Sequence, residues 1–233
     1  RYIRGDGGYV GVHAAADTEY TWPWYGQLVG AYFRNHPNGT PTATVVVEDP
    51  NDPSTAHLPA RWTRVDEWYN FQSPVNPVVG GGGADYSPRN TTGIHVLLTM
   101  DESTYVEADG SDGVDDDHPI AWCHRFDGGR AWYTGLGHTD ASFSEAEFLL
   151  HLQAGIEITA GTVGSAACGN PPGANQHPTV QASRTPSGDV TTGTEIEFTA
   201  LGSDPDGDPL TYAWEFGDGE TSTAQNPTHA YVS

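Results

Sequence analysis

Residues 7–17, with the sequence GGYVGVHAAAD, constrain the fold of this chain more than any other segment. They predict a short buried strand over 9–12 that ends abruptly at a polar residue, His13. The small residues around it allow the backbone to turn sharply and pack closely. In an open α/β sheet ligands bind at the carboxyl ends of strands, so this pattern places His13 at the edge of a site. The alternative is a histidine that caps a turn or lies in the core.

The rest of the first 163 residues alternates between predicted helices and strands. Helices are expected over 22–36 and over 145–159, the second begun by a capping box of Ser144 and Glu147. The residues expected to face the sheet are Trp24, Leu28 and Tyr32 in the first helix, and Phe148, Leu152 and Ile156 in the second. Strands are expected over 42–48 and 94–99, and a hairpin over 118–135 with its turn at 126–129.

The charge balance is strongly acidic. The net charge is −22, the isoelectric point is about 4.4, and every basic side chain is arginine. Such a surface argues against nucleic acid and anionic lipid as partners. It suits high salt, where screening weakens self-repulsion, so a halophilic source and a secreted protein from a GC-rich genome both remain open. No apolar run is long enough to insert into a membrane.

The two cysteines, Cys123 and Cys168, fit no zinc-binding spacing. We predict that they form one structural disulfide in an exported protein, which would attach the segment after the second helix to the sheet. Two separate buried thiols are the alternative.

Polar residues at predicted strand ends define a candidate site. His13, Glu67 and His138 are the candidate catalytic residues, because histidines and carboxylates serve as acids and bases for hydrolysis or for proton abstraction beside a ketone. The same side chains could hold a divalent metal. Candidate ligand-binding residues are Asp17, Trp22, Trp24, Trp68, Tyr69, His118 and Thr139, with the indole rings as flat faces for a sugar. For Glu67, in an aromatic run, a solvated strand end is the alternative.

Four segments carry a resemblance to a known family: GYVGVHAAADTEYTWPWY, LPARWTRVDEWYNF, DHPIAWCHRFDGGRAWYTGLGHT and HLQAGIEITAG. Over roughly residues 1–165 the chain resembles the ThuA-like family, named for trehalose utilisation. The resemblance implies an α/β, flavodoxin-like three-layer sandwich similar to class I glutamine amidotransferases. Because the chain opens near its elbow strand, we expect a fragment that lacks upstream strands and helices.

The resemblance also bears on the chemistry. In the amidotransferases the elbow carries a nucleophilic cysteine, whereas the matching position here is His13 and Cys123 lies elsewhere. A cysteine-dependent amidotransferase is therefore not expected. Family members similar to this chain are often parts of large secreted proteins that act on sugars.

The chain changes character after residue 163. Residues 164–177 predict a linker, rich in glycine, alanine and proline. Residues 178–233, with YAWEFGDG and NPTHAY, resemble a PKD domain, an all-β immunoglobulin-like sandwich that is truncated here. Asp204, Asp206 and Asp208 alternate around a glycine as calcium ligands do, although an acidic turn explains them equally well. For Asp115, Asp116 and Asp117 a solvated acidic tip is favoured over a cation site.

Two functions follow as hypotheses. One is a secreted or cell-surface carbohydrate-active protein, hydrolase-like, acting on a sugar or sugar derivative through His13, Glu67 and His138. The other is a non-catalytic carbohydrate-binding or scaffold module of a larger extracellular protein. In either case the expected partners are a carbohydrate and further domains of the same polypeptide.

Overall fold

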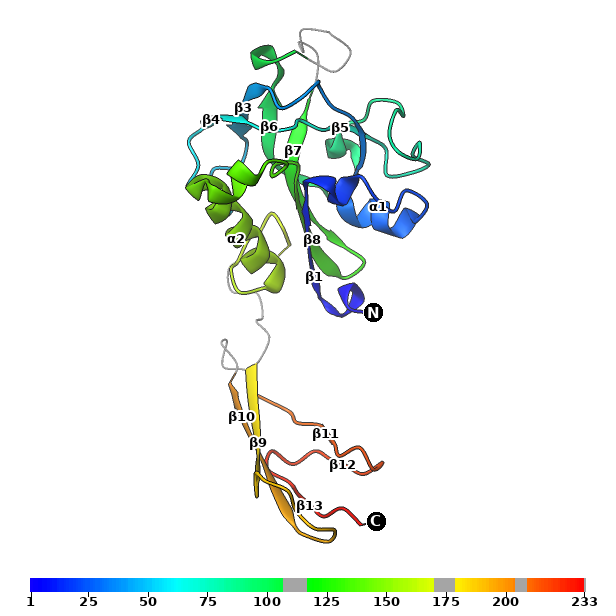
Figure 1. Cartoon of the computed structure of the whole chain (residues 1–233), viewed down its shortest axis with the longest axis vertical. Coiled ribbons are helices and arrows are strands. Elements are labelled where there is room, and N and C mark those ends of the chain that lie inside the picture. The colour runs from blue at the N-terminus through cyan, green and yellow to red at the C-terminus, as the bar shows by residue number, and fades with distance from the viewer. Residues whose placement is uncertain (107–116, 170–178, 204–208, 233) are drawn as a thin grey trace. The chain divides into compact units, whose positions relative to one another are not determined.

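The computed structural model describes residues 1–106, 117–169, 179–203 and 209–232. The chain divides into two compact units, residues 1–174 and 175–233 (Figure 1). Within the described residues, no helix is both long and apolar enough to cross a membrane.

A six-stranded sheet forms the centre of the N-terminal unit, in the order β1-β8-β7-β6-β3-β4. Its strands are β1 (Gly8–Val12), β3 (Thr42–Val47), β4 (Arg61–Val65), β6 (His95–Asp101), β7 (Pro119–Phe126) and β8 (Gly129–Thr134). A separate pair joins β2 (Tyr32–Asn35) to β5 (Asn70–Gln72). The predicted hairpin is confirmed, since β7 and β8 pair in antiparallel register around the turn.

The sheet is mixed rather than parallel. Among the described strands of this sheet, β1 and β8 pair in parallel, and the other neighbours are antiparallel. A flavodoxin-like sheet is built from parallel strands, and this sheet has that arrangement only at its β1–β8 edge. Strand β1 is parallel to β8, and from β8 onward each strand reverses the direction of its neighbour. Strands β1, β8, β6 and β4 therefore run in the same direction, and their carboxyl ends share one edge of the sheet.

Helices cover both faces of the sheet at the β1–β8 edge. Successive strand residues point to opposite faces. Trp132 of β8 packs against Gly155 of α2 (Ala146–Ala160), where a β-carbon would clash with the indole. Ala131 packs on the other face with Leu28 of α1 (Pro23–Val29). This edge thus has the helix–sheet–helix layering of an α/β domain.

The prediction of one helix over 22–36 is wrong in its second half. Helix α1 ends at Gly30, whose φ of 103° is open to glycine but strained for other residues. The chain then continues as strand β2. The aromatic residues Tyr32 and Phe33 fit a half-buried strand as well as a helix face, which is why their spacing was misleading.

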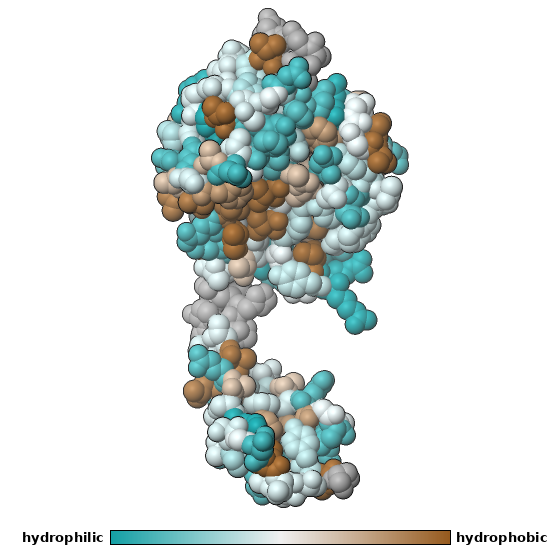
Figure 2. Space-filling model, viewed as in Figure 1, coloured by the Kyte–Doolittle hydropathy of each residue, from teal (hydrophilic) through white to brown (hydrophobic). Residues whose placement is uncertain are grey.

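Helix α2 also departs from its prediction. It begins after Glu145 without a side-chain cap, so the expected capping box of Ser144 and Glu147 is not formed. Phe148 is buried as expected, but Ile156 is 50% exposed and Leu150 is equally so. Figure 2 shows the resulting hydrophobic area over α2. The buried face instead uses smaller or polar residues: His151, Gly155 and Thr159.

The predicted disulfide is confirmed. Cys123 of β7 and Cys168 are bonded, with their α-carbons 5.1 Å apart. The bond attaches the segment after α2 to the middle of the sheet. Both sulfur atoms are therefore engaged, and neither offers a thiolate for nucleophilic catalysis.

The C-terminal unit consists of short antiparallel strands. They are β9 (Thr179–Thr185), β10 (Ile196–Ser203), β11 (Trp214–Glu215), β12 (Thr221–Ser222) and β13 (Thr228–His229). The rings of Phe198, Trp214 and Phe216 pack together, with centroids 5.3–5.6 Å apart for Phe198 and its two neighbours. Asp204, Asp206 and Asp208 lie outside the described residues, so calcium binding there stays a prediction.

A buried histidine of α2 couples the stability of the N-terminal unit to pH. His151 is fully buried; its Nδ1–H donates to the carbonyl of Ser54 at 2.7 Å, and the Thr134 hydroxyl donates to Nε2 at 3.2 Å. Burial lowers the pKa of His151 to about 4 from its usual 6.5, because the charged form has lost its water. Between pH 6.5 and about 4, the His151 ring therefore binds a proton in the unfolded chain but not in the folded chain.

We predict that His151 makes the protein less stable as pH falls from 6.5 to 4. The shift corresponds to a loss of about 3 kcal/mol, with the full stability present above pH 6.5. Urea unfolding at intervals across this range measures it. His151→Gln should flatten this part of the curve, whereas the exposed His57→Gln should not. Parallel curves for wild type and His151→Gln would contradict the prediction.

Candidate functional site

Three side chains from separate strands meet at the shared edge of the sheet. His13 follows β1, His138 follows β8, and Glu67 follows β4. His13 Nε2 and His138 Nδ1 each lie 3.1 Å from Glu67 Oε2, and 3.1 Å from one another. Glu67 lies in the segment that joins β4 to β5, and these two strands lie on opposite sides of the view in Figure 1. This segment carries Glu67 toward the two histidines.

The backbone and ring of His13 are both fixed. Its φ is 45°, a left-handed conformation that is rare for histidine, and the Tyr133 hydroxyl donates to its carbonyl at 2.9 Å. The ring is buried and packs on Tyr69, with centroids 4.1 Å apart. Nδ1–H donates to the carbonyl of Gly135 at 2.9 Å. Since a carbonyl only accepts, the Nε2 lone pair of the neutral ring faces Glu67 and His138.

The buried carboxylate of Asp66 holds the two loops together. It accepts backbone N–H bonds from Gly137 at 2.8 Å, from His138 at 2.9 Å and from Glu67 at 3.0 Å. One carboxylate thus fixes the backbone on which two of the three site side chains stand. Gly137 has a φ of 101°, so the loop needs glycine at this position to present its N–H.

Arg64 compensates the buried charge of Asp66. Its Nη2 lies 3.1 Å from Asp66 Oδ2 and from Glu145 Oε2, and donates to the Ser142 hydroxyl at 2.8 Å. Burial lowers the pKa of the Arg64 guanidinium, while the two carboxylates oppose that effect. A buried ion pair of this kind contributes little net stability but is costly to break from one side.

His36 is a site residue that sequence reasoning missed. Its Nε2 lies 3.4 Å from Glu67 Oε1, and its Nδ1–H donates to the carbonyl of Pro37 at 2.7 Å. It therefore repeats the arrangement of His13, with a carbonyl on one nitrogen and Glu67 at the other. The helix predicted over 22–36 concealed it, although the helix-stop signal at Gly30 could have indicated a new element.

Three of the predicted binding residues lie around this cluster. Tyr69 is buried between His13 and Phe33; burial, the adjacent Glu67 and Asp17 raise the pKa of its hydroxyl. Asp17 is exposed and accepts from the Tyr20 hydroxyl at 2.5 Å. Thr139 is the N-cap of the 3₁₀ turn Asp140–Ser144 and accepts from the Ser142 N–H at 3.3 Å.

Two further predicted binding residues are structural. Trp68 has no exposed surface, and its indole N–H donates to the Pro41 carbonyl at 2.8 Å, so it offers no face to a ligand. His118 is buried with both ring nitrogens engaged, one by the Tyr69 carbonyl and the other by Glu102. Neither can act as the sequence suggested, because burial satisfies their polar atoms within the protein.

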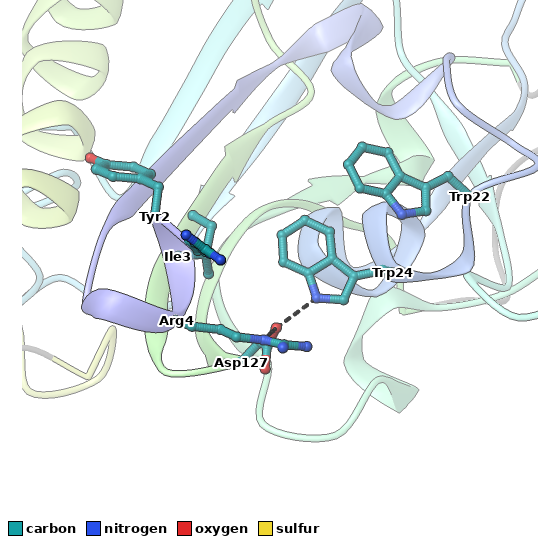
Figure 3. Close-up of a pocket in the computed structure, with 7 residues that line it drawn as sticks. Tyr2, Ile3, Arg4, Trp22, Trp24 and Asp127 are labelled. Carbon is teal, nitrogen blue, oxygen red and sulfur yellow. Dashed lines mark hydrogen bonds and ion pairs between the residues drawn. The ribbon is translucent and has the colours of Figure 1, made fainter.

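Trp22 and Trp24 lie in a different groove. The Trp24 indole N–H donates to Asp127 Oδ2 at 2.8 Å, and Asp127 lies in the β7–β8 turn, at the end of β8 opposite to His138. Figure 3 shows the Trp24 indole hydrogen-bonded to this carboxylate beside Arg4, with Trp22 farther from the ion pair. The groove is lined by Arg1, Tyr2, Ile3, Arg4, Trp22, Trp24 and Asp127.

Among the described residues, His13, Glu67 and His138 form a group able to hold a metal ion, with ligand atoms within 4.8 Å of one another. Asp117, from the predicted acidic tip, is instead ion-paired with Arg89 at 2.7 Å. Its neighbours Asp115 and Asp116 lie outside the described residues.

An α/β unit with a histidine–carboxylate cluster at the strand ends is thus joined to a small β unit. Residues 1–159 match the family model for trehalose utilisation, and residues 175–233 match a PKD domain. The chain belongs to the trehalose utilisation (ThuA) family.

The chain is also similar to individual proteins. A solved ThuA-like protein from Bacteroides uniformis is 27% identical, with a TM-score of 0.52 over 69% of this chain and 61% of its own. A second, from Parabacteroides merdae, is 19% identical, with a TM-score of 0.49 over 68% of this chain and 62% of its own. Collagenase ColQ1 of Bacillus cereus is 47% identical over 60 residues, which are 25% of this chain and 6% of the collagenase. The chain thus spans less than two thirds of these proteins.

We predict that Asp66→Asn destabilises the N-terminal unit by about 3 kcal/mol or more. The amide nitrogen of asparagine only donates, so it cannot accept the backbone N–H groups that Asp66 accepts. Arg64 also stays buried without its full counter-charge. Urea unfolding followed by tryptophan fluorescence measures the loss. Asp140→Asn, at an exposed carboxylate of the neighbouring turn, is the matched control. Equal midpoints for the two variants would contradict the role given to Asp66.

Proposed function

We propose that this protein is a secreted or cell-surface carbohydrate-active enzyme, hydrolase-like, which acts on a sugar or sugar derivative at His13, Glu67 and His138. One observation carries the proposal: two imidazoles and a carboxylate from three strands converge within 3.1 Å at the sheet edge. Ordinary packing does not require such convergence, because each group would be equally well hydrated outside the cluster.

The groups differ in access, which suggests their roles. The His13 side chain is 7% exposed and that of Glu67 13%, whereas His138 is 43% exposed. A substrate therefore approaches from the His138 side. Glu67 is placed to take a proton from a water, or from a carbon beside a ketone. His138 is placed to give one to the oxygen on which charge develops, and His13 holds Glu67 in position.

The context supports a carbohydrate and an extracellular setting. The family is named for the utilisation of trehalose, the chain also carries a PKD domain, and 60 of its residues are similar to part of a collagenase. The disulfide fits an oxidising compartment. The net charge of −22 argues against nucleic acid as a partner. Further domains of the same polypeptide are expected partners.

We predict that Glu67→Gln and His138→Ala each lower kcat/KM on the accepted sugar at least 100-fold, because loss of a general acid or base costs 10² to 10⁴. The full chain is assayed against trehalose, other disaccharides and their oxidised derivatives, with product sugars quantified by chromatography. His57→Ala, an exposed histidine outside the cluster, should keep full activity. Folded Glu67→Gln protein with unchanged turnover would overturn the proposal.

A second function, non-catalytic carbohydrate binding, is favoured by the groove at Trp22 and Trp24. Trp22 is 49% exposed and stacks on Trp24, with ring centroids 5.4 Å apart and planes 26° apart. An exposed indole face beside the ion pair of Arg4 and Asp127 offers both the apolar surface and the polar groups that a sugar ring needs.

We predict that Trp22→Ala weakens sugar binding roughly tenfold if this groove is the binding site, from the loss of stacking and buried area. Calorimetric titration of the full chain with disaccharides measures it. Leu150→Ala, which removes an equally exposed apolar side chain from α2, should bind as wild type does. Unchanged binding in Trp22→Ala would exclude the groove.

A further inference from the structure

We propose that the cluster is a mononuclear divalent transition-metal centre, with His13 Nε2, His138 Nδ1 and Glu67 Oε2 as ligands. The inference rests on the proposed function and deepens it by naming the cofactor class. With an ion bound, Glu67 Oε1 and His138 Nε2 lie outside the ligand set and are the atoms that keep the proton-transfer roles given above. The inference can fail or hold independently, because metal binding is measured without any sugar.

Two ring nitrogens and a carboxylate oxygen converge in the cluster. The Gly135 carbonyl takes the Nδ1–H of His13, so its neutral ring turns an unprotonated Nε2 toward the cluster. That nitrogen lies 3.1 Å from His138 Nδ1 and from a carboxylate oxygen. Two ring nitrogens and a carboxylate oxygen at this spacing are held together either by a shared proton or by a cation.

The spacing suits a metal ion. Ligand atoms about 2.1 Å from a tetrahedral ion lie about 3.4 Å from one another, and about 3.0 Å apart at neighbouring positions of an octahedral ion. The three separations of 3.1 Å fall between these values. Two imidazoles and one carboxylate on one face, with the other side open, are the ligand set of zinc and of non-haem iron sites.

The surroundings supply what metal-binding histidines require. Such a ligand donates its second N–H to a carbonyl or carboxylate, which fixes its tautomer and orientation. His13 does so to Gly135 at 2.9 Å, and the neighbouring His36 makes the same kind of bond to Pro37 at 2.7 Å. The ring of Tyr69 lies between them, 4.1 Å from His13 and 6.3 Å from His36 by centroids. Asp66 holds the backbone at Glu67 and His138.

The position of His36 defines its role. Its Nε2 lies 3.4 Å from Glu67 Oε1, on the other oxygen of the carboxylate that His13 and His138 contact. The half-buried His36 ring thus contacts Glu67 from outside the group of three ligand atoms. His36 therefore orients the Glu67 carboxylate, and the open side near His138 receives water or substrate oxygen.

Metal titration of the full chain tests the inference. Protein stripped with a chelator is titrated with Zn²⁺ by calorimetry and with Co²⁺ by visible absorption. We expect one tightly bound ion per chain, which excess Ca²⁺ does not displace because nitrogen ligands disfavour it. Glu67→Gln and His138→Ala should each weaken Zn²⁺ binding at least tenfold, and His36→Ala should change the Co²⁺ spectrum. His57→Ala should bind as wild type does.

Two results would overturn the inference. One is the absence of stoichiometric Zn²⁺ binding by the stripped, folded protein. The other is equal Zn²⁺ affinity in wild type, Glu67→Gln and His138→Ala. His138→Ala changes an exposed side chain, so it still tests the site if Glu67→Gln does not fold. Sugar turnover by metal-free protein would refute the metal's role and leave the proposed function standing. Metal binding without any sugar turnover would support the metal site and refute the proposed function.

Discussion

The carboxylate of Asp66 is the interaction on which the site depends. It is fully buried and accepts backbone N–H bonds from Glu67, Gly137 and His138. Strands β4 and β8 are separated by three strands in the sheet, so their following loops would not meet without such a link. The charge is tolerated because three N–H groups and the guanidinium of Arg64 replace the water it loses.

The direction of the strands makes this link possible. Although most neighbours are antiparallel, β1, β8 and β4 run in the same direction and end at one edge. Two of them, β1 and β8, end at a turn that fixes a polar side chain: the left-handed His13 after β1, and His138 after the glycine loop that follows β8. The sheet therefore acts as a rigid support, and the variable chemistry lies in the segments that follow its strands.

Sequence reasoning singled out His13 and His138 because each follows a predicted strand, and Glu67 because it is a carboxylate within an aromatic run. The structure brings the three side chains together, and their catalytic role stays a prediction. Sequence reasoning missed His36 because aromatic spacing over 22–36 fits a helix and a half-buried strand alike. It misassigned Trp68 and His118, whose burial depends on packing between distant segments. The disulfide was predictable from composition, whereas the role of Asp66 depended on contacts more than seventy residues away in sequence.

The most direct test of convergence at the Asp66-linked loops is anomalous diffraction from crystals of the full chain soaked in Zn²⁺. The account predicts one strong peak about 2.0–2.2 Å from His13 Nε2, His138 Nδ1 and Glu67 Oε2. The Asp66 carboxylate should still accept the backbone N–H groups of Gly137 and His138. A peak at an exposed histidine such as His57, with Glu67 turned to solvent, would contradict it.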